Sequence, residues 1–98
     1  MIIYCDIDGV LCTQDQTKPS LYHLAKPIKK NIERLNSLYY ANHTIILWTA
    51  RGSISGVDYR DLTEAQLEEW GVKYHKLRMD KPYFDKFIDD RLLRMEDL

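Results

Sequence analysis

Met1–Cys12, with the sequence MIIYCDIDGVLC, is the stretch that decides the fold. Its apolar run Ile2–Cys5 has no polar interruption, which is typical of a strand buried on both faces within a parallel sheet. The run ends at Asp6, and Asp8 and Gly9 follow in what reads as a tight turn. Because open α/β sheets bind their ligands at the carboxyl ends of their strands, we expect both acids to face a binding crevice.

The two acids also give this turn a strong negative charge. Neighbouring carboxylates repel each other unless a cation or a proton lies between them. The close spacing of Asp6 and Asp8 therefore predicts a bound metal ion in the crevice, since carboxylate oxygens are ligands that hard cations prefer.

The composition is that of one small globular domain covering residues 1–98. The chain has 98 residues, 45% of them hydrophobic, and a formal net charge of −1, which allows one core and excludes bulk attraction to nucleic acids or anionic membranes. Neither a signal peptide nor an apolar run of bilayer length is evident, so we expect a cytoplasmic protein without a membrane partner. Cys5 and Cys12 belong to no metal-binding pattern and are expected to be reduced.

Helical and strand patterns alternate along the rest of the chain. Residues 13–26 are polar and mixed, which is typical of a loop. A helix is expected to begin near Pro27 and end near Asn42, because apolar residues recur there at helical spacing. Those residues are Ile28, Ile32, Leu35 and Tyr39. The apolar run Thr44–Trp48 predicts a second buried strand.

A second helix is indicated by its capping residues. Thr63 and Gln66 have the spacing of a capping box, and Gly71 is a typical residue after a helix end. A third strand is expected over Val72–Leu77 and a very short fourth one over Lys86–Ile88. The connection between them is shorter than a parallel crossover usually needs, so the sequence leaves the strand order open.

Polar side chains follow the predicted strands or, for Lys81, precede the last one. They are Asp6, Asp8, Thr49, Lys81, Asp89 and Asp90. A hydroxyl and an ammonium group can hold the oxygens of a phosphate, and clustered carboxylates can hold Mg²⁺. Together these residues predict phosphoryl-transfer chemistry.

The same residues carry a resemblance to a known family. DIDGV at Asp6–Val10, Thr49 after an apolar strand, Lys81, and IDD at Ile88–Asp90 resemble, in this order, the four motifs of the haloacid dehalogenase superfamily in its phosphatase branch. The sequences TARG at residues 49–52 and KPYFDKFIDDR at residues 81–91 are also similar to those of small uncharacterised or capsule-associated members of this superfamily. The resemblance implies a minimal Rossmann-like α/β fold, a three-layer sandwich with a mostly parallel sheet of about four strands and no cap domain.

The resemblance also implies a role for each matching residue. Asp6 would be the nucleophile that forms an aspartyl-phosphate, and Asp8 would act as general acid and base. The implied catalytic set is Asp6, Asp8, Thr49 and Lys81. The implied substrate-binding set is Thr49, Ala50, Arg51 and Lys81, with Arg91 as a further candidate. Mg²⁺ would be held by Asp6, Asp8 (through its carbonyl), Asp89 and Asp90. The expected activity is Mg²⁺-dependent hydrolysis of a phosphomonoester.

Several alternatives stay open at the level of sequence. Residues 9–26 and 50–80 are too short to contain an inserted cap, so either a large substrate or a neighbouring subunit of a homo-oligomer would have to cover the crevice. The substrate could be a sugar phosphate, a nucleotide or a phosphorylated macromolecule. A different class is a phosphate-accepting or phosphate-binding module without turnover, resembling a signalling receiver or a scaffold subunit. Phosphomutase activity is a minor option.

Overall fold

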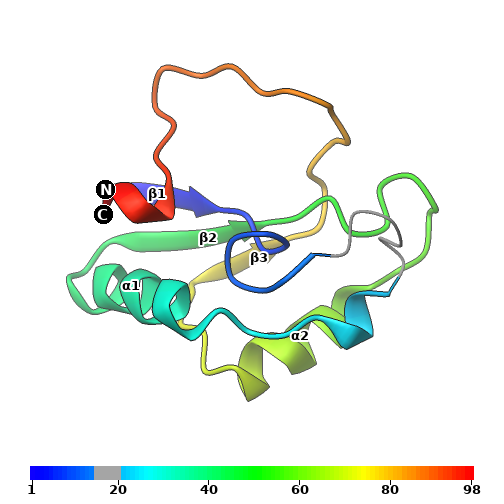
Figure 1. Cartoon of the computed structure of the whole chain (residues 1–98), viewed down its shortest axis with the longest axis horizontal. Coiled ribbons are helices and arrows are strands. Elements are labelled where there is room, and N and C mark those ends of the chain that lie inside the picture. The colour runs from blue at the N-terminus through cyan, green and yellow to red at the C-terminus, as the bar shows by residue number, and fades with distance from the viewer. Residues whose placement is uncertain (15–20) are drawn as a thin grey trace.

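Three parallel strands form the centre of the fold (Figure 1). The computed structural model describes residues 1–14 and 21–98. Strand β1 spans Ile2–Cys5, β2 spans Thr44–Trp48 and β3 spans Lys76–Arg78, in the order β1-β2-β3. The predicted first and second strands are confirmed, and the arrangement is an α/β fold compatible with a Rossmann-like sheet. Part of the predicted loop 13–26 lies outside the described residues.

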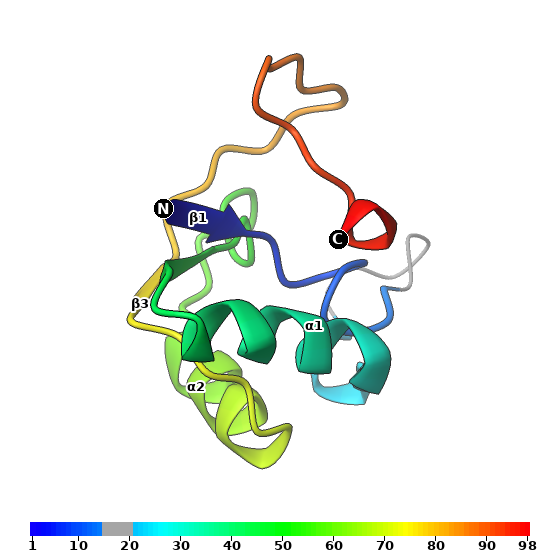
Figure 2. The same ribbon diagram turned by 90° about the vertical axis from the view of Figure 1, so that its left-hand side faces the viewer.

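Both long helices pack on one face of the sheet (Figures 1 and 2). Helix α1 spans Lys29–Tyr40 and α2 spans Arg60–Glu69, and short 3₁₀ turns occur at Tyr22–Leu24 (η1) and Met95–Asp97 (η2). Crossovers between parallel strands are right-handed, so two crossovers that step in the same direction place both helices on the same side. The fold therefore has two layers, and the expectation of a three-layer sandwich is corrected.

The core fills the space between the sheet and the helices. Strand residues alternate between the two faces of a sheet, and the register aligns Cys5, Leu47 and Leu77 across the three strands, all of them buried. Ile32 and Leu35 of α1 are the buried residues of the helical face. Burial of each such aliphatic side chain stabilises the fold by about 1.5–3 kcal/mol.

The opposite face of the sheet carries no helix among the residues described here. The register aligns Tyr4, Ile46 and Lys76 across this face, and Ile2 and Tyr4 are 70% and 48% exposed. The expectation that the first strand is buried on both faces is therefore wrong, because no helix covers this side of β1 within the described residues.

The sheet has three strands rather than about four. The expected strand at Lys86–Ile88 does not form, because the chain after β3 leaves the sheet in a wide arc before it returns at η2 (Figure 1). Ile88 is 97% exposed, so this short run lacks the burial that would stabilise pairing. We refer to residues 79–94 as the C-terminal arc.

Two other element boundaries differ from the sequence prediction. β3 begins at Lys76 rather than at Val72; Val72 is buried in the connection after α2, where its N–H donates to the carbonyl of Leu67. Helix α2 begins three residues before Thr63, so the predicted capping box is wrong. Asp58 accepts a hydrogen bond from the N–H of Arg60 at the true start of this helix.

The predicted helix ends are confirmed. Asn42 and Gly71 have φ angles of 70° each, the left-handed conformation typical of the residue that follows a helix. The predicted start of α1 near Pro27 is also close, since this helix begins at Lys29. In the portion of the chain that the structure describes, no helix has the length and apolar character needed to cross a bilayer.

Candidate functional site

The carboxyl edge of the sheet brings Asp6 and Lys81 together. The Lys81 ammonium nitrogen Nζ lies 3.3 Å from Oδ2 of Asp6, and the side chains are 15% and 39% exposed, respectively. The other oxygen of Asp6 accepts a hydrogen bond of 2.8 Å from the N–H of Ile7. The N–H of Lys81 donates to the carbonyl of Thr49 at 3.2 Å, which ties the start of the C-terminal arc to the end of β2. The structure therefore brings Asp6 and Lys81 together, as expected for residues at one sheet edge.

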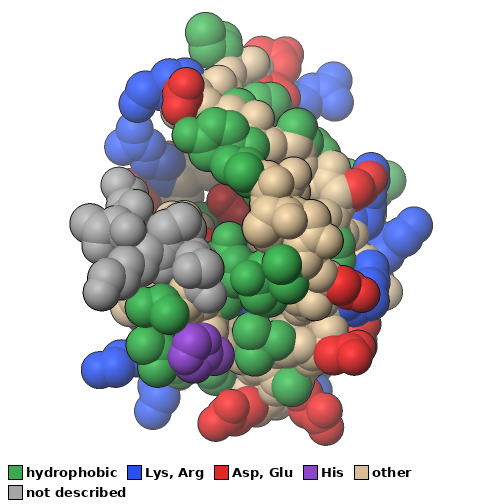
Figure 3. Space-filling view, turned by 90° about the vertical axis from the view of Figure 1, so that its right-hand side faces the viewer, with side chains coloured by type: hydrophobic (Ala, Val, Ile, Leu, Met, Phe, Trp, Pro, Cys, Tyr) green, Lys and Arg blue, Asp and Glu red, His purple; other side chains and the backbone are tan. Residues whose placement is uncertain are grey.

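A recess opens on the side of the molecule toward which the strands point. Figure 3 shows acidic atoms deep in this recess, with hydrophobic side chains next to it and Lys or Arg side chains at its other border. Asp6 remains partly exposed at this edge. A small anionic ligand can therefore approach the edge, provided that a cation offsets the carboxylate charge.

Asp8 has a different environment from Asp6. The Nε of Arg51 donates to Oδ2 of Asp8 and its Nη2 donates to Oδ1, both at 2.9 Å. The Arg51 side chain is fully buried and that of Asp8 is 11% exposed. Such a two-point contact fixes both the position and the orientation of the carboxylate. Within residues 1–14 and 21–98, Oδ2 accepts this one hydrogen bond, which leaves a second acceptor site on that oxygen.

Helix α2 holds the far side of the Arg51 guanidinium. Nη1 of Arg51 donates to Oγ1 of Thr63 at 3.1 Å and to Oε1 of Gln66 at 2.6 Å. Nη2 also lies 3.8 Å from Sγ of Cys12. Every nitrogen of the guanidinium thus donates to a partner inside the protein, as a buried cation requires. We call Asp8, Cys12, Arg51, Thr63 and Gln66 the Arg51 network.

Tyr22 covers the Arg51 network from the loop before α1. The guanidinium carbon lies 4.7 Å from the centre of the Tyr22 ring, a distance at which the ring face attracts a cation. The amide of Gln66 donates to the Tyr22 carbonyl at 2.7 Å. Burial acts to lower the pKa of Arg51, but the hydrogen bonds and charge of Asp8 outweigh it and raise that pKa. Arg51 therefore stays charged.

The two cysteines are buried thiols, as the sequence predicted. Burial, with a smaller contribution from the charge of Asp6, raises the pKa of Cys5 to about 12. Burial and then the charge of Asp8 raise the pKa of Cys12 to about 12. Sγ of Cys12 lies 3.4 Å from Oδ1 of Asp8, where it can donate a hydrogen bond. Both thiols thus stay protonated and serve packing.

The structure gives the remaining predicted substrate-binding residues internal partners. Thr49 is 1% exposed, and its hydroxyl accepts a hydrogen bond of 3.2 Å from the N–H of Arg51. The carbonyl of Ala50 accepts one from the N–H of Ser53. Because its donors are all engaged, Arg51 in this arrangement binds Asp8 rather than a ligand.

The predicted metal ligands are not brought together. Within residues 1–14 and 21–98, no three His, Cys, Asp or Glu side chains are grouped so that they could hold a metal ion. Asp89 and Asp90 are exposed on the C-terminal arc, where Oδ1 of Asp89 accepts a hydrogen bond from the N–H of Arg91. As arranged here, the predicted carboxylates of Asp6, Asp89 and Asp90 are not grouped into a Mg²⁺ site.

An aromatic and cationic cluster adjoins Asp6. The Arg78 guanidinium carbon lies 5.7 Å from the ring centre of Tyr4 and 5.6 Å from that of Trp48. Asp80 accepts hydrogen bonds from Arg78 and from the indole of Trp48. Those from Arg78 are the largest cause that holds the pKa of Asp80 below its usual value. Asp80 therefore remains an anion that orients both side chains.

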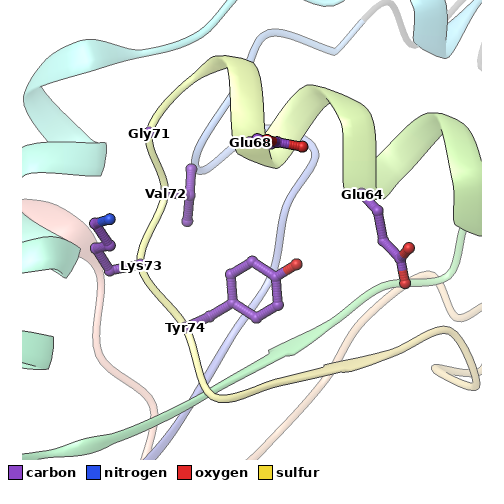
Figure 4. A pocket seen from close by; sticks show the side chains of 6 residues that line it. All are labelled: Glu64, Glu68, Gly71, Val72, Lys73 and Tyr74. Atoms are coloured by element: carbon purple, nitrogen blue, oxygen red, sulfur yellow. The ribbon is translucent and has the colours of Figure 1, made fainter.

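A shallow hollow of about 410 Å³ lies elsewhere, between α2 and the chain leading to β3 (Figure 4). Glu64 and Glu68 of α2 line it together with Tyr74. Burial, followed by the charge of Glu64, raises the pKa of the Tyr74 hydroxyl. None of the predicted site residues lines this hollow.

Comparison with known proteins supports the fold. A crystal structure of a structural-genomics target from Vibrio cholerae aligns with a TM-score of 0.84 and 23% sequence identity, covering 98% of this chain and 85% of that one. No family model matches the sequence, and the curated proteins hold no significant match. At this identity the likeness concerns the fold alone.

The sequence reasoning missed the Arg51 network. It assigned Thr63 and Gln66 to a helix cap, although both side chains bind Arg51. One signal was present, because a cation directly after a buried strand and an acid after the neighbouring strand share one sheet edge. The inward direction of both side chains depends on packing and carries no local sequence signal.

Proposed function

We propose that this chain is a phosphomonoester hydrolase in which Asp6 accepts the phosphoryl group. The observation that carries the proposal is the Lys81 ammonium nitrogen 3.3 Å from Oδ2 of Asp6 at the carboxyl edge of a parallel sheet. A cation at this position offsets the charge of the attacking carboxylate and can also bind the oxygens of the transferring group.

The proposed reaction has two steps. An Asp6 oxygen forms a bond to phosphorus while the ester P–O bond breaks, and the leaving oxygen takes a proton. Water then attacks the aspartyl-phosphate, releases phosphate and restores the carboxylate. Asp8 in its protonated form is the proposed donor of that proton, and its carboxylate then takes a proton from the attacking water. Oδ2 is the proposed atom, because within the described residues Arg51 Nε is its hydrogen-bond donor and a second acceptor site is left.

Mg²⁺ stays in the proposal as a requirement to be tested. When bound, the ion would offset the charge of a phosphoryl group. The predicted ligands are not grouped into a metal site within the described residues, and both proposed steps use only groups of the protein itself. Assays with and without Mg²⁺ address this point directly.

The decisive experiment is the Asp6→Asn variant. We expect it to abolish the release of phosphate from an aryl phosphate, because an amide is a poor nucleophile toward phosphorus. Asp61→Asn, which changes an exposed acid of α2, is the matched control and should keep the wild-type rate. Full activity in the Asp6→Asn variant would remove Asp6 from its proposed role.

A second candidate is a module that accepts or binds phosphate without turnover. The firm contact of Asp8 with Arg51 favours it, because a tightly held carboxylate is a less adaptable proton carrier. A small phosphodonor should then label the protein with a phosphoryl group that persists for hours. Rapid release of that label as inorganic phosphate would favour the hydrolase.

A homo-oligomer remains a proposal as well. Part of the open sheet face is apolar, including Ile2 and Tyr4, and a second copy could cover it. Trp70 and Tyr74 pack partly buried against the core and do not add to this open face. The mass of the protein in solution tests this proposal.

A further inference from the structure

Two exposed phenylalanines stand next to the Asp6–Lys81 pair. The Lys81 ammonium nitrogen lies 5.3 Å from the ring centre of Phe84 and 5.8 Å from that of Trp48. The rings of Phe84 and Phe87 are 5.3 Å apart and tilted by 32°. Aromatic surface therefore extends outward from the ammonium group that contacts Asp6.

These rings are open to a ligand. Phe84 is 38% exposed and Phe87 is 48% exposed, although burying such rings would be favourable. Both belong to the C-terminal arc, which forms no strand and lies away from the core. The core therefore does not account for their position beside Lys81.

We propose that Phe84 and Phe87 receive an aromatic ring carried by the leaving group of the phosphomonoester, which makes an aromatic phosphate the preferred substrate class. This inference rests on the proposed function for its kinetic part only. Lys81 joins the two parts, since its ammonium group contacts both the carboxylate and the Phe84 ring. A substrate would place its phosphate at Asp6 and its ring against the phenylalanines.

The charges of Lys81, Arg78 and Asp80 are consistent with this placement of the substrate. Lys81 attracts the phosphate, whereas the nearby Arg78 is already neutralised by Asp80. The arc side of the pair thus offers the apolar ring surface of Phe84 and Phe87 next to the Lys81 ammonium group. Ring stacking of this kind contributes about 0.5–1.5 kcal/mol, which corresponds to roughly a 2- to 13-fold preference.

Binding of phosphonates tests the inference without any turnover. We expect the wild-type protein to bind benzylphosphonate about tenfold more tightly than methylphosphonate. Phe84→Ala should remove this preference. Tyr83→Ala is the matched control, because Tyr83 is a neighbouring exposed aromatic residue whose hydroxyl binds Asp85, and it should keep the preference.

Kinetic measurements provide a second test, and they distinguish an aryl phosphate from a nucleotide as the substrate that carries the ring. Phosphotyrosine presents an aryl ester, adenosine 5′-monophosphate presents a nucleoside, and glycerol 3-phosphate presents no ring. We expect Phe84→Ala to lower kcat/KM about tenfold for whichever aromatic substrate is preferred and to leave that for glycerol 3-phosphate unchanged.

The two proposals fail in different ways. Equal binding of the two phosphonates by the wild type, or an unchanged preference in Phe84→Ala, would overturn the aromatic site and leave the hydrolase standing. A clear preference for benzylphosphonate without any phosphate release would support the aromatic site and overturn the hydrolase.

Discussion

Asp6 and Asp8 lie two residues apart after the same strand, yet their surroundings differ in almost every respect. Arg51 holds Asp8 through two hydrogen bonds of 2.9 Å and is fully buried. The Asp6 side chain is 39% exposed, and within the described residues it forms its ion pair with Lys81. A buried partner thus fixes the orientation of Asp8, whereas Asp6 is more open to a ligand.

The largest expected effect on stability comes from breaking the Arg51 network. Arg51→Met should lower the free energy of unfolding by about 3–5 kcal/mol, because it leaves Asp8 without its buried partner. Denaturation in urea measures this loss. Glu64→Gln is the control: it weakens the exposed pair with Arg60 and should cost less than about 1 kcal/mol. Similar losses in the two variants would contradict the assigned difference in burial.

Alkaline pH should destabilise the protein through the two buried thiols near these acids. Burial raises the pKa of Cys5 and of Cys12 from 9.0 to about 12. Since each folded pKa is raised, the stabilising contribution is complete below the unfolded value and is lost as the pH rises toward the folded value. We expect each thiol to lower stability by about 1.4 kcal/mol per pH unit in this window.

Single Cys5→Ala and Cys12→Ala variants separate the two thiols in that experiment. Unfolding should be measured at about pH 8 and about pH 10.5, on either side of the ordinary thiol pKa. Each variant should show a weaker pH dependence than the wild type. Identical pH dependence in all three proteins would mean that neither thiol is held protonated by burial.

The smallest expected effect on stability comes from breaking the Asp6–Lys81 pair. Lys81→Met should change the free energy of unfolding by no more than about 1 kcal/mol, because Asp6 is partly solvated in their ion pair. The same change should lower the proposed phosphatase activity by about 10²–10³-fold through loss of the phosphate-binding cation. A large loss of stability in Lys81→Met would place this pair with the structural network instead.

Local patterns predicted the parts of the fold that local forces determine. The uninterrupted apolar runs of β1 and β2 predicted two strands of the sheet, and Asn42 and Gly71 suited the left-handed backbone after each helix. Lys86–Ile88 was also predicted to be a strand, but it does not pair with the sheet. A three-residue run offers few ladder hydrogen bonds, so its conformation depends on neighbours that the sequence does not reveal.

The candidate site was predictable in its residue types but only partly in its geometry. Asp6 and Lys81 meet at the edge because each follows a parallel strand. Thr63 and Gln66 fit a cap by spacing, yet their partner is Arg51, which lies 12 and 15 residues earlier in the chain. Contacts at such separation depend on how α2 packs, which spacing alone does not encode.

The attachment of the C-terminal arc at both ends has a consequence for how the protein can vary. Lys81 ties one end to Thr49, and at the other end the carbonyl of Met95 accepts a hydrogen bond from Arg34 while Met95 packs against the core. Doubling the length of such a tethered loop costs only about 0.6 kcal/mol in closure entropy. Insertions and substitutions in the arc should therefore cost little stability while the acids after β1 stay in place, so the proposed ring-binding surface can vary independently of the proposed nucleophile.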